Sequence, residues 1–182
     1  MPRLVAPAGL AGFVLLAGCH GGGGGTAAPA PSVPSTVQVT SPAFAAGATI
    51  PRQFTCAGSG QSPPLAWSGT GSAAALALVV DDPDAPGGTF VHWVVLDLPG
   101  SSTGVPQGGA LPPGATQARD SAGRTGWTPP CPPSGTHHYR FTVYVLRAPA
   151  RLADGAANGD ALAVVGRLAS ARGQLVGVVS HG

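Results

Sequence analysis

The stretch "AALALVVDDPDAP", residues 74–86, joins a continuous apolar segment to a turn that holds three carboxylates and two prolines. An apolar run of this length, bounded by turn-forming residues, predicts a strand that is covered on both faces. The whole chain has seven acidic residues, so three of them lie in this one turn. Crowded carboxylates repel one another and are costly to bury, which indicates a specific role for the turn.

Two further segments have the same character. "FVHWVVLDL" (90–98) and "HYRFTVYVL" (138–146) are rich in β-branched and aromatic residues and predict two more central strands. No helical pattern separates the three segments, so we expect a mainly β fold with hairpins and long loops, such as the Gly/Pro-rich segment 99–135. One C-terminal helix is predicted over 161–172, capped by Asp160 and ended by Gly173, with Leu162, Val165 and Leu168 on one face. Residues 174–180 predict a last short strand.

The N-terminal region is predicted to target the protein to the cell envelope. Arg3 precedes an apolar run over 4–17, and "LLAGC" ends at Cys19. This pattern is typical of an export signal, and it resembles the bacterial lipobox, which implies cleavage before Cys19 and lipid on its sulfur. The alternative, an N-terminal core helix, has no matching fold in the Gly-rich stretch that follows. We therefore expect a lipoprotein signal peptide (1–19), a flexible Gly/Pro linker (20–36) and one domain (37–182).

Composition excludes several classes of function. The formal charge of +2 comes from scattered arginines, so the chain has no basic stripe for a nucleic-acid partner. Cys56 and Cys131 remain if Cys19 is lipidated, and in an exported protein such a pair is more often a disulfide than two free thiols. Neither has metal-ligand spacing to its neighbours, so we expect no metal and no cofactor.

Period-two alternation along the three strands predicts which side chains share a face. His92 is predicted on one face with Phe90, Val94 and Leu96, while His138 and Arg140 point away from His137. Taken alone, each of these polar residues is best interpreted as a core or turn residue whose side chain has a local hydrogen-bond partner. Together they lie near three strand ends, where unpartnered burial is expensive, so we expect them to meet. The two remaining faces are Leu76, Leu78, Val80 and Asp82 on one strand, and His137, Tyr139, Phe141, Val143 and Val145 on another.

Several motifs together resemble one family. "DPDAP" (82–86), "HW" (92–93) and "CPPSGTHHY" (131–139) look like the phosphatidylethanolamine-binding protein family, in its bacterial Raf-kinase-inhibitor-like branch. "FTC" (54–56) and "QSPPLAW" (61–67) are also similar to that branch, and the resemblance covers roughly residues 38–180. It implies a β-sandwich-type core with a small pocket for phosphate or phosphorylated head groups. The pocket residues that it implies are Asp82, Asp84, Ala85, Pro86, Phe90, His92, Pro132, Pro133, His137 and Tyr139.

Three positions depart from the family pattern. His138 stands where the family has arginine, Pro129 where it has glycine, and Val179 where bacterial relatives tend to have tyrosine. Proline lacks an N–H, so Pro129 cannot donate to a ligand. The carboxylates are expected to build the pocket: Asp82 would orient a histidine and favour its charged ring, Asp84 would fix the turn, and Asp81 would be solvated.

The leading hypothesis is a non-catalytic envelope lipoprotein that binds a small anionic or phosphorylated ligand. It would contact the membrane through its lipid anchor. The resemblance also supports a second hypothesis, a regulatory inhibitor of a protease or kinase partner. A hydrolase with histidine and aspartate as general base is the third, and it lacks a nucleophile-elbow motif.

Overall fold

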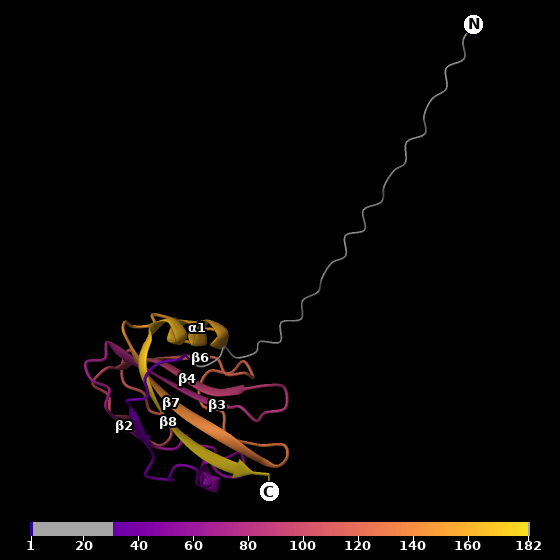
Figure 1. The fold of residues 1–182 in the computed structure, drawn as a ribbon. Helices are drawn as coiled ribbons and strands as arrows, with labels where there is room; N and C mark the ends of the chain where they lie inside the picture. Colours follow the sequence, from indigo (N-terminus) through magenta and orange to yellow (C-terminus); the bar gives the residue numbers. More distant parts are fainter. Residues whose placement is uncertain (2–30, 182) are drawn as a thin grey trace.

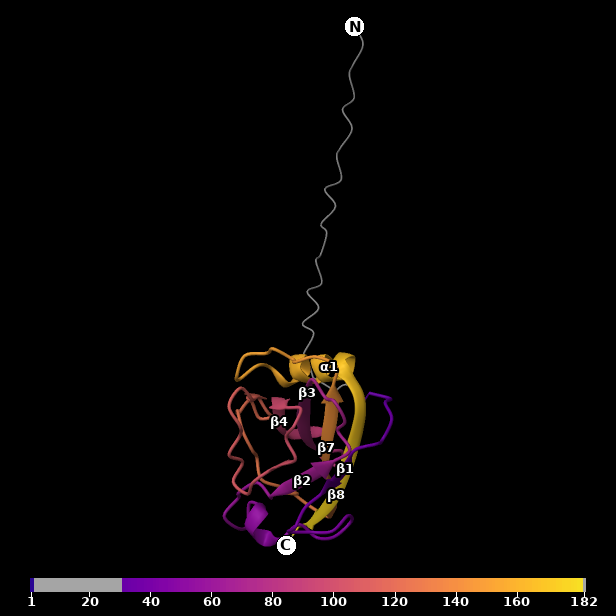
Figure 2. The same ribbon diagram turned by 90° about the vertical axis from the view of Figure 1, so that its left-hand side faces the viewer.

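The computed structural model describes Met1 and residues 31–181, and the predicted lipidation site at Cys19 and most of the predicted linker lie outside these residues. The described chain folds into strands, one short 3-10 helix and one α-helix, seen from two sides in Figures 1 and 2. In chain order the elements are β1 (Gln38–Thr40), η1 (Arg52–Phe54), β2 (Leu65–Ser68), β3 (Ala75–Asp82), β4 (Phe90–Pro99), β5 (Gly104–Val105), β6 (Thr116–Ala118), β7 (Thr136–Leu146), α1 (Asn158–Leu168) and β8 (Ala169–Ser180).

The strands form two antiparallel sheets. The larger sheet has the order β6-β4-β3-β7-β8, and the smaller has the order β1-β2-β5. Because side chains alternate along a strand, β3 contributes to two cores. Leu76, Leu78 and Val80 pack between the two sheets, whereas Ala77 and Val79 pack on the other face with residues of α1. The mainly β architecture expected from the sequence is confirmed, and the three predicted central strands are β3, β4 and β7.

The C-terminal helix differs from the prediction. It begins at Asn158 and ends at Leu168, and β8 follows directly at Ala169. Gly173 does not end the helix, because it lies inside β8 where another segment passes very close. A Cβ atom at this position would lie 1.9 Å from the backbone oxygen of Val37. This glycine is therefore required for the close approach of the N-terminal segment to β8.

A β-bulge in β4 changes the predicted face of His92. Val80 pairs with Trp93 and Asp81 pairs with Val91, so His92 is an extra residue in β4. Extra residues of this kind bend a strand and redirect its side chains. The prediction that His92 shares a face with Val94 and Leu96 is wrong, because those two residues pack in the core beneath α1. The ring of His92 instead lies against Tyr139, with 5.2 Å between ring centroids.

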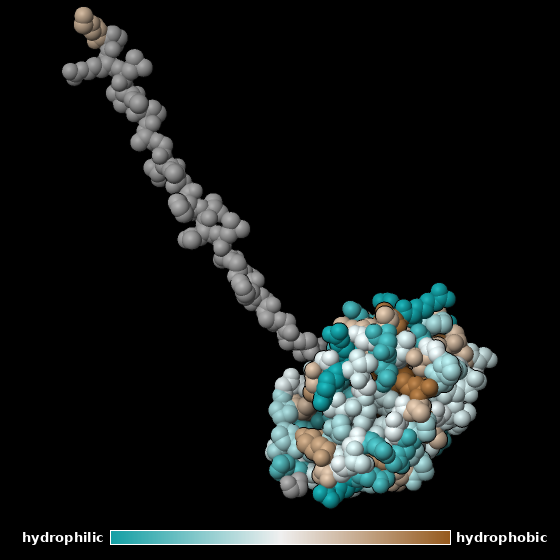
Figure 3. Space-filling model, turned by 180° about the vertical axis from the view of Figure 1, so that it is seen from behind, coloured by the Kyte–Doolittle hydropathy of each residue, from teal (hydrophilic) through white to brown (hydrophobic). Residues whose placement is uncertain are grey.

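The face of the molecule behind the view of Figure 1 is mainly polar. Figure 3 shows that the face behind the view of Figure 1 carries only small, separate hydrophobic patches. Among the described residues, Met1 is the only large hydrophobic side chain that is fully exposed. In that same part of the chain, no helix is both long and apolar enough to cross a membrane.

Candidate functional site

A small cavity lies where β3 ends and where β4 and β7 begin. Its volume is about 200 Å³. Antiparallel pairing brings these strand ends together, since Asp82 pairs with Phe90, and Asp81 pairs with Arg140. The segment 128–133 closes one side. The lining residues are Asp82, Ala85, Pro86, Phe90, His92, Thr128, Pro129, Cys131, Pro132, Pro133, His137 and Tyr139.

Nine of the ten residues proposed from the sequence line this cavity. The exception is Asp84, whose carboxylate faces β7 outside the cavity. Sequence reasoning did not propose Thr128, Pro129 or Cys131 as lining residues, although they lie directly before or within the "CPPSGTHHY" motif. Val179 lines a different, larger cavity.

Asp82 and His137 form a buried pair inside the cavity wall. The Nδ1 atom of His137 lies 2.7 Å from Oδ2 of Asp82, and both side chains are almost fully buried. The other oxygen of Asp82 accepts the backbone N–H of Asp84 at 2.8 Å, which closes the turn after β3. Asp82 therefore orients the imidazole and fixes the turn with one carboxylate.

The other two carboxylates of the turn pair with the outer face of β7. Asp81 accepts two hydrogen bonds from the guanidinium of Arg140, at 2.8 and 2.5 Å, so the prediction that Asp81 is merely solvated is wrong. Asp84 accepts two hydrogen bonds from His138, one from its backbone N–H and one from its ring Nδ1–H, both at 2.8 Å. These hydrogen bonds hold the pKa of Asp84 below its usual value. The acidic turn is thus joined to β7 by three separate pairs.

His92 is held by a backbone carbonyl on the opposite side of the cavity. Its Nδ1 atom lies 2.8 Å from the carbonyl oxygen of Thr128. A carbonyl can only accept, so Nδ1 carries the proton, and Nε2 has no protein partner among the described residues. Burial lowers the pKa of His92, while the Thr128 carbonyl and the nearby Asp82 and Asp120 act in the opposite direction. Burial in the cavity wall therefore favours the neutral form of the ring.

Thr128 is itself held by a buried aspartate that sequence reasoning missed. The Thr128 hydroxyl donates a short hydrogen bond to Oδ2 of Asp120. The Oδ1 atom of Asp120 accepts the backbone N–H groups of Ala122 and Arg124, each at 2.8 Å. The turn-forming sequence "DSAG" at 120–123 is a signal that could have identified this residue.

The hydroxyl of Tyr139 completes the polar groups of the cavity. Tyr139 is fully buried, and its hydroxyl lies near the carboxylate of Asp82 without forming a hydrogen bond of good geometry. Burial and the nearby carboxylate of Asp82 both raise its pKa, so the hydroxyl stays protonated and can donate. A buried donor of this kind needs an explanation, and a bound ligand supplies one.

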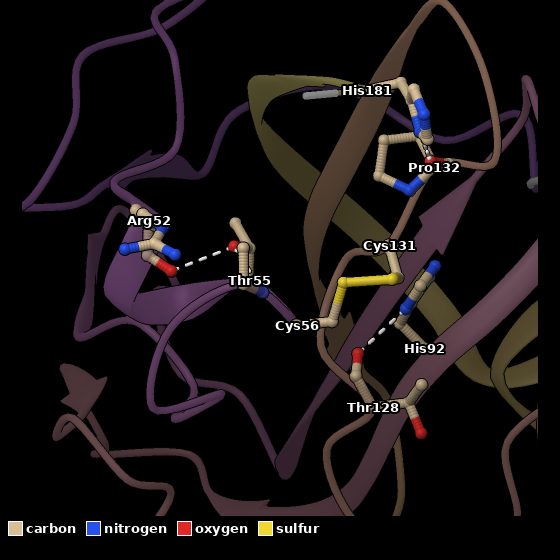
Figure 4. Close-up of a disulfide and its surroundings, with 9 residues drawn as sticks. Arg52, Thr55, Cys56, His92, Thr128, Cys131, Pro132 and His181 are labelled. Carbon is tan, nitrogen blue, oxygen red and sulfur yellow. Dashed lines mark hydrogen bonds between the residues drawn. A yellow bond between two sulfur atoms is a disulfide. The ribbon is translucent and has the colours of Figure 1, made fainter.

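A disulfide supports the wall of the cavity. Cys56 and Cys131 form this bond in the structure, as expected from the sequence (Figure 4). The backbone N–H of Cys56 also donates to the carbonyl of Pro130 at 3.0 Å, and His181 Nδ1 lies 3.0 Å from the carbonyl of Pro132. The segment that closes the cavity is therefore attached both to the region of η1 and to the end of β8.

The fold and this site define a class: a two-sheet β protein with a small cavity formed by histidines and a tyrosine at the ends of its central strands. Residues 40–179 match the family described as phosphatidylethanolamine-binding protein. The chain belongs to this family.

Individual relatives extend the comparison. The chain is 46% identical to the protein named "Putative lipoprotein LppC" of Mycobacterium tuberculosis, over 95% of this chain and 94% of that protein. The Chlamydia trachomatis homologue CT736 has a crystal structure with 32% identity and a TM-score of 0.76, covering 81% of this chain and 99% of that chain. Escherichia coli YbcL, also solved, has 29% identity and the same TM-score, covering 81% of this chain and all of that chain.

Proposed function

We propose that this protein is an envelope lipoprotein whose cavity binds a small anionic or phosphorylated ligand. One observation carries the proposal: His92, His137 and Tyr139 line one cavity, and the Nε2 atom of each histidine has no protein partner among the described residues. Unsatisfied polar groups at a buried site are costly, and a small ligand that offers both accepting and protonated oxygen atoms would satisfy them.

The size of the cavity favours a small group. A volume of about 200 Å³ suits a phosphate-sized ligand and is below the range of roughly 300–1,000 Å³ found for drug-sized ligands. The ends of three strands and a disulfide-linked segment build its walls, so the polar groups are positioned before the ligand arrives. Preorganisation of this kind reduces the cost of binding.

The chemistry of the wall supports binding without catalysis. Cys131 is oxidised in the disulfide, and the Thr128 hydroxyl already donates to Asp120. Among the described lining residues, neither group is therefore available as a nucleophile activated by a histidine. Attachment to the membrane through Cys19 is supported by the "LLAGC" motif and by the lipoprotein name of the mycobacterial relative.

Titration of the mature protein with inorganic phosphate tests this function. His137→Ala should weaken binding roughly tenfold to a hundredfold, because it removes a hydrogen bond to an anion that is worth about 1.5–3 kcal/mol. His92→Ala should also weaken binding. Isothermal calorimetry gives the affinities directly.

His138→Ala is the matched control, because His138 is the next residue along β7 and its side chain is exposed and bonded to Asp84. It should keep an affinity close to that of the wild type. Equal losses in all three variants, or no loss in the first two, would show that the histidines are structural and would contradict the proposal.

A further inference from the structure

We infer that the cavity selects a phosphoryl group that still carries a proton on one oxygen, and that it discriminates against oxyanions without such a proton. The ligand class is inorganic phosphate or a singly protonated phosphomonoester. This inference rests on the proposed function and adds a specificity that anion binding alone does not predict.

The position of the proton on His92 is the first step. The Thr128 carbonyl, 2.8 Å away, requires the proton on Nδ1. In the neutral ring, which burial favours, Nε2 carries a lone pair, so it accepts a hydrogen bond from a ligand in the cavity and cannot donate one. His92 is only 5% exposed, and burial at this depth disfavours a second proton.

The surrounding structure keeps this arrangement in place. The backbone N–H of Thr128 donates to the carbonyl of His92 at 3.0 Å, so the two residues are joined by two hydrogen bonds. The Thr128 side chain is held by the buried Asp120. For Nε2 to become the protonated nitrogen of a neutral ring, the Thr128 carbonyl would have to lose its donor inside the protein, which is costly.

The other groups of the cavity are complementary to such a ligand. Tyr139 supplies a hydroxyl that can donate to a phosphoryl oxygen. Among the described residues that line the cavity there is no arginine, and the one carboxylate, Asp82, is already bonded to His137. Because no permanent cation lines the site, hydrogen-bond matching should decide between ligands of equal charge. A P–OH group can donate a hydrogen bond to Nε2 of His92. Sulfate has no such proton, so one of its oxygen lone pairs would face the lone pair of Nε2.

The comparison of phosphate with sulfate tests this point. In mildly alkaline solution both are tetrahedral dianions of similar size, and only phosphate keeps a proton. Calorimetry with the mature protein should show at least about a tenfold preference for phosphate, the effect expected when a buried acceptor loses its donor. Equal affinities would overturn the inference and leave the proposed function standing. Binding of neither anion would instead contradict the proposed function.

His92→Gln is the decisive variant. The glutamine amide can turn to present either an N–H group or an oxygen to the ligand. The affinity for sulfate should therefore rise relative to that for phosphate, and the preference for phosphate should largely disappear. His138→Gln is the control, because the exposed side chain of His138 lies outside the cavity, and it should leave both affinities and their ratio close to those of the wild type. An unchanged ratio in a folded His92→Gln protein would show that another group sets the preference.

Acidification of the wild-type protein gives a second measurement without mutation. His92 lies near Asp82 and Asp81 on β3, His137 and Tyr139 on β7, and the loop carboxylate Asp120. Its pKa is lowered, so its charged form appears only in acid solution, where Nε2 becomes a donor and the preference over sulfate should shrink. Because phosphate also gains a second proton in acid, His92→Gln is measured alongside, and a wild-type ratio that follows the ratio of the variant over the whole pH range would overturn the inference.

Methyl phosphate and dimethyl phosphate separate the possible sources of the ligand. Near pH 6, close to the second pKa of phosphomonoesters at about 6, methyl phosphate is partly a monoanion with a P–OH group, whereas dimethyl phosphate is a monoanion without one. The monoester should bind and the diester, which has the chemistry of most phospholipid head groups, should bind at least about tenfold more weakly. Equal binding of the two would contradict the inference.

Discussion

Removal of the Cys56–Cys131 disulfide should lower the free energy of unfolding by about 4 kcal/mol, or roughly a thousandfold in the unfolding equilibrium constant. The two cysteines are separated by 75 positions in the sequence, so the bond closes a long loop in the unfolded chain. In the chain-entropy description, such a crosslink reduces the conformational freedom of the unfolded state. For a domain of this size, the loss corresponds to a decrease in the melting temperature of roughly 10 °C.

Denaturant unfolding of Cys56→Ser/Cys131→Ser against the wild type measures this effect. Ser134→Ala, an exposed change close to Cys131, is the control and should alter stability by less than about 0.5 kcal/mol. Mass measurement of the alkylated, unreduced wild type should find no free thiol at either cysteine. Labelling of both thiols, or a double variant as stable as the wild type, would show that the mature protein does not depend on this bond.

Replacement of Cys19 should move the protein from the membrane to the soluble fraction. Each buried CH₂ of a lipid chain contributes about 0.8 kcal/mol to membrane binding, so two attached chains anchor a protein stably. Cys19→Ser removes the sulfur that would carry the lipid.

Fractionation of cells that express each variant, followed by mass analysis of the N-terminus, checks this prediction. The Cys56→Ser/Cys131→Ser protein is a matched control, since it loses two cysteines but keeps Cys19 and should stay in the membrane fraction. A wild-type protein that is already soluble after export would contradict lipidation.

The sequence by itself determined the central strands and most of the residues around the cavity. Apolar runs bounded by turn residues predicted β3, β4 and β7, because strand formation and turn chemistry depend on neighbouring residues. Alternation also placed His137 and Tyr139 on the inner face of β7 and His138 and Arg140 on the outer face, as the structure has them. The family motifs added the proline-rich wall at 132–133.

Only the tertiary structure decided how these parts face one another. The direction of the His92 side chain depends on a β-bulge, which arises from the pairing of β4 with β3. The sequence pattern of β4 alone does not reveal this bulge. The partner of Asp81 is set by the pairing of β3 with β7, and the need for glycine at 173 by the passage of Val37 beside β8. Asp120 acts on His92 through Thr128, across a segment with no periodic pattern. Each of these features is a contact between segments distant in the chain, and local sequence patterns determine the faces of a strand but not the register of its partner.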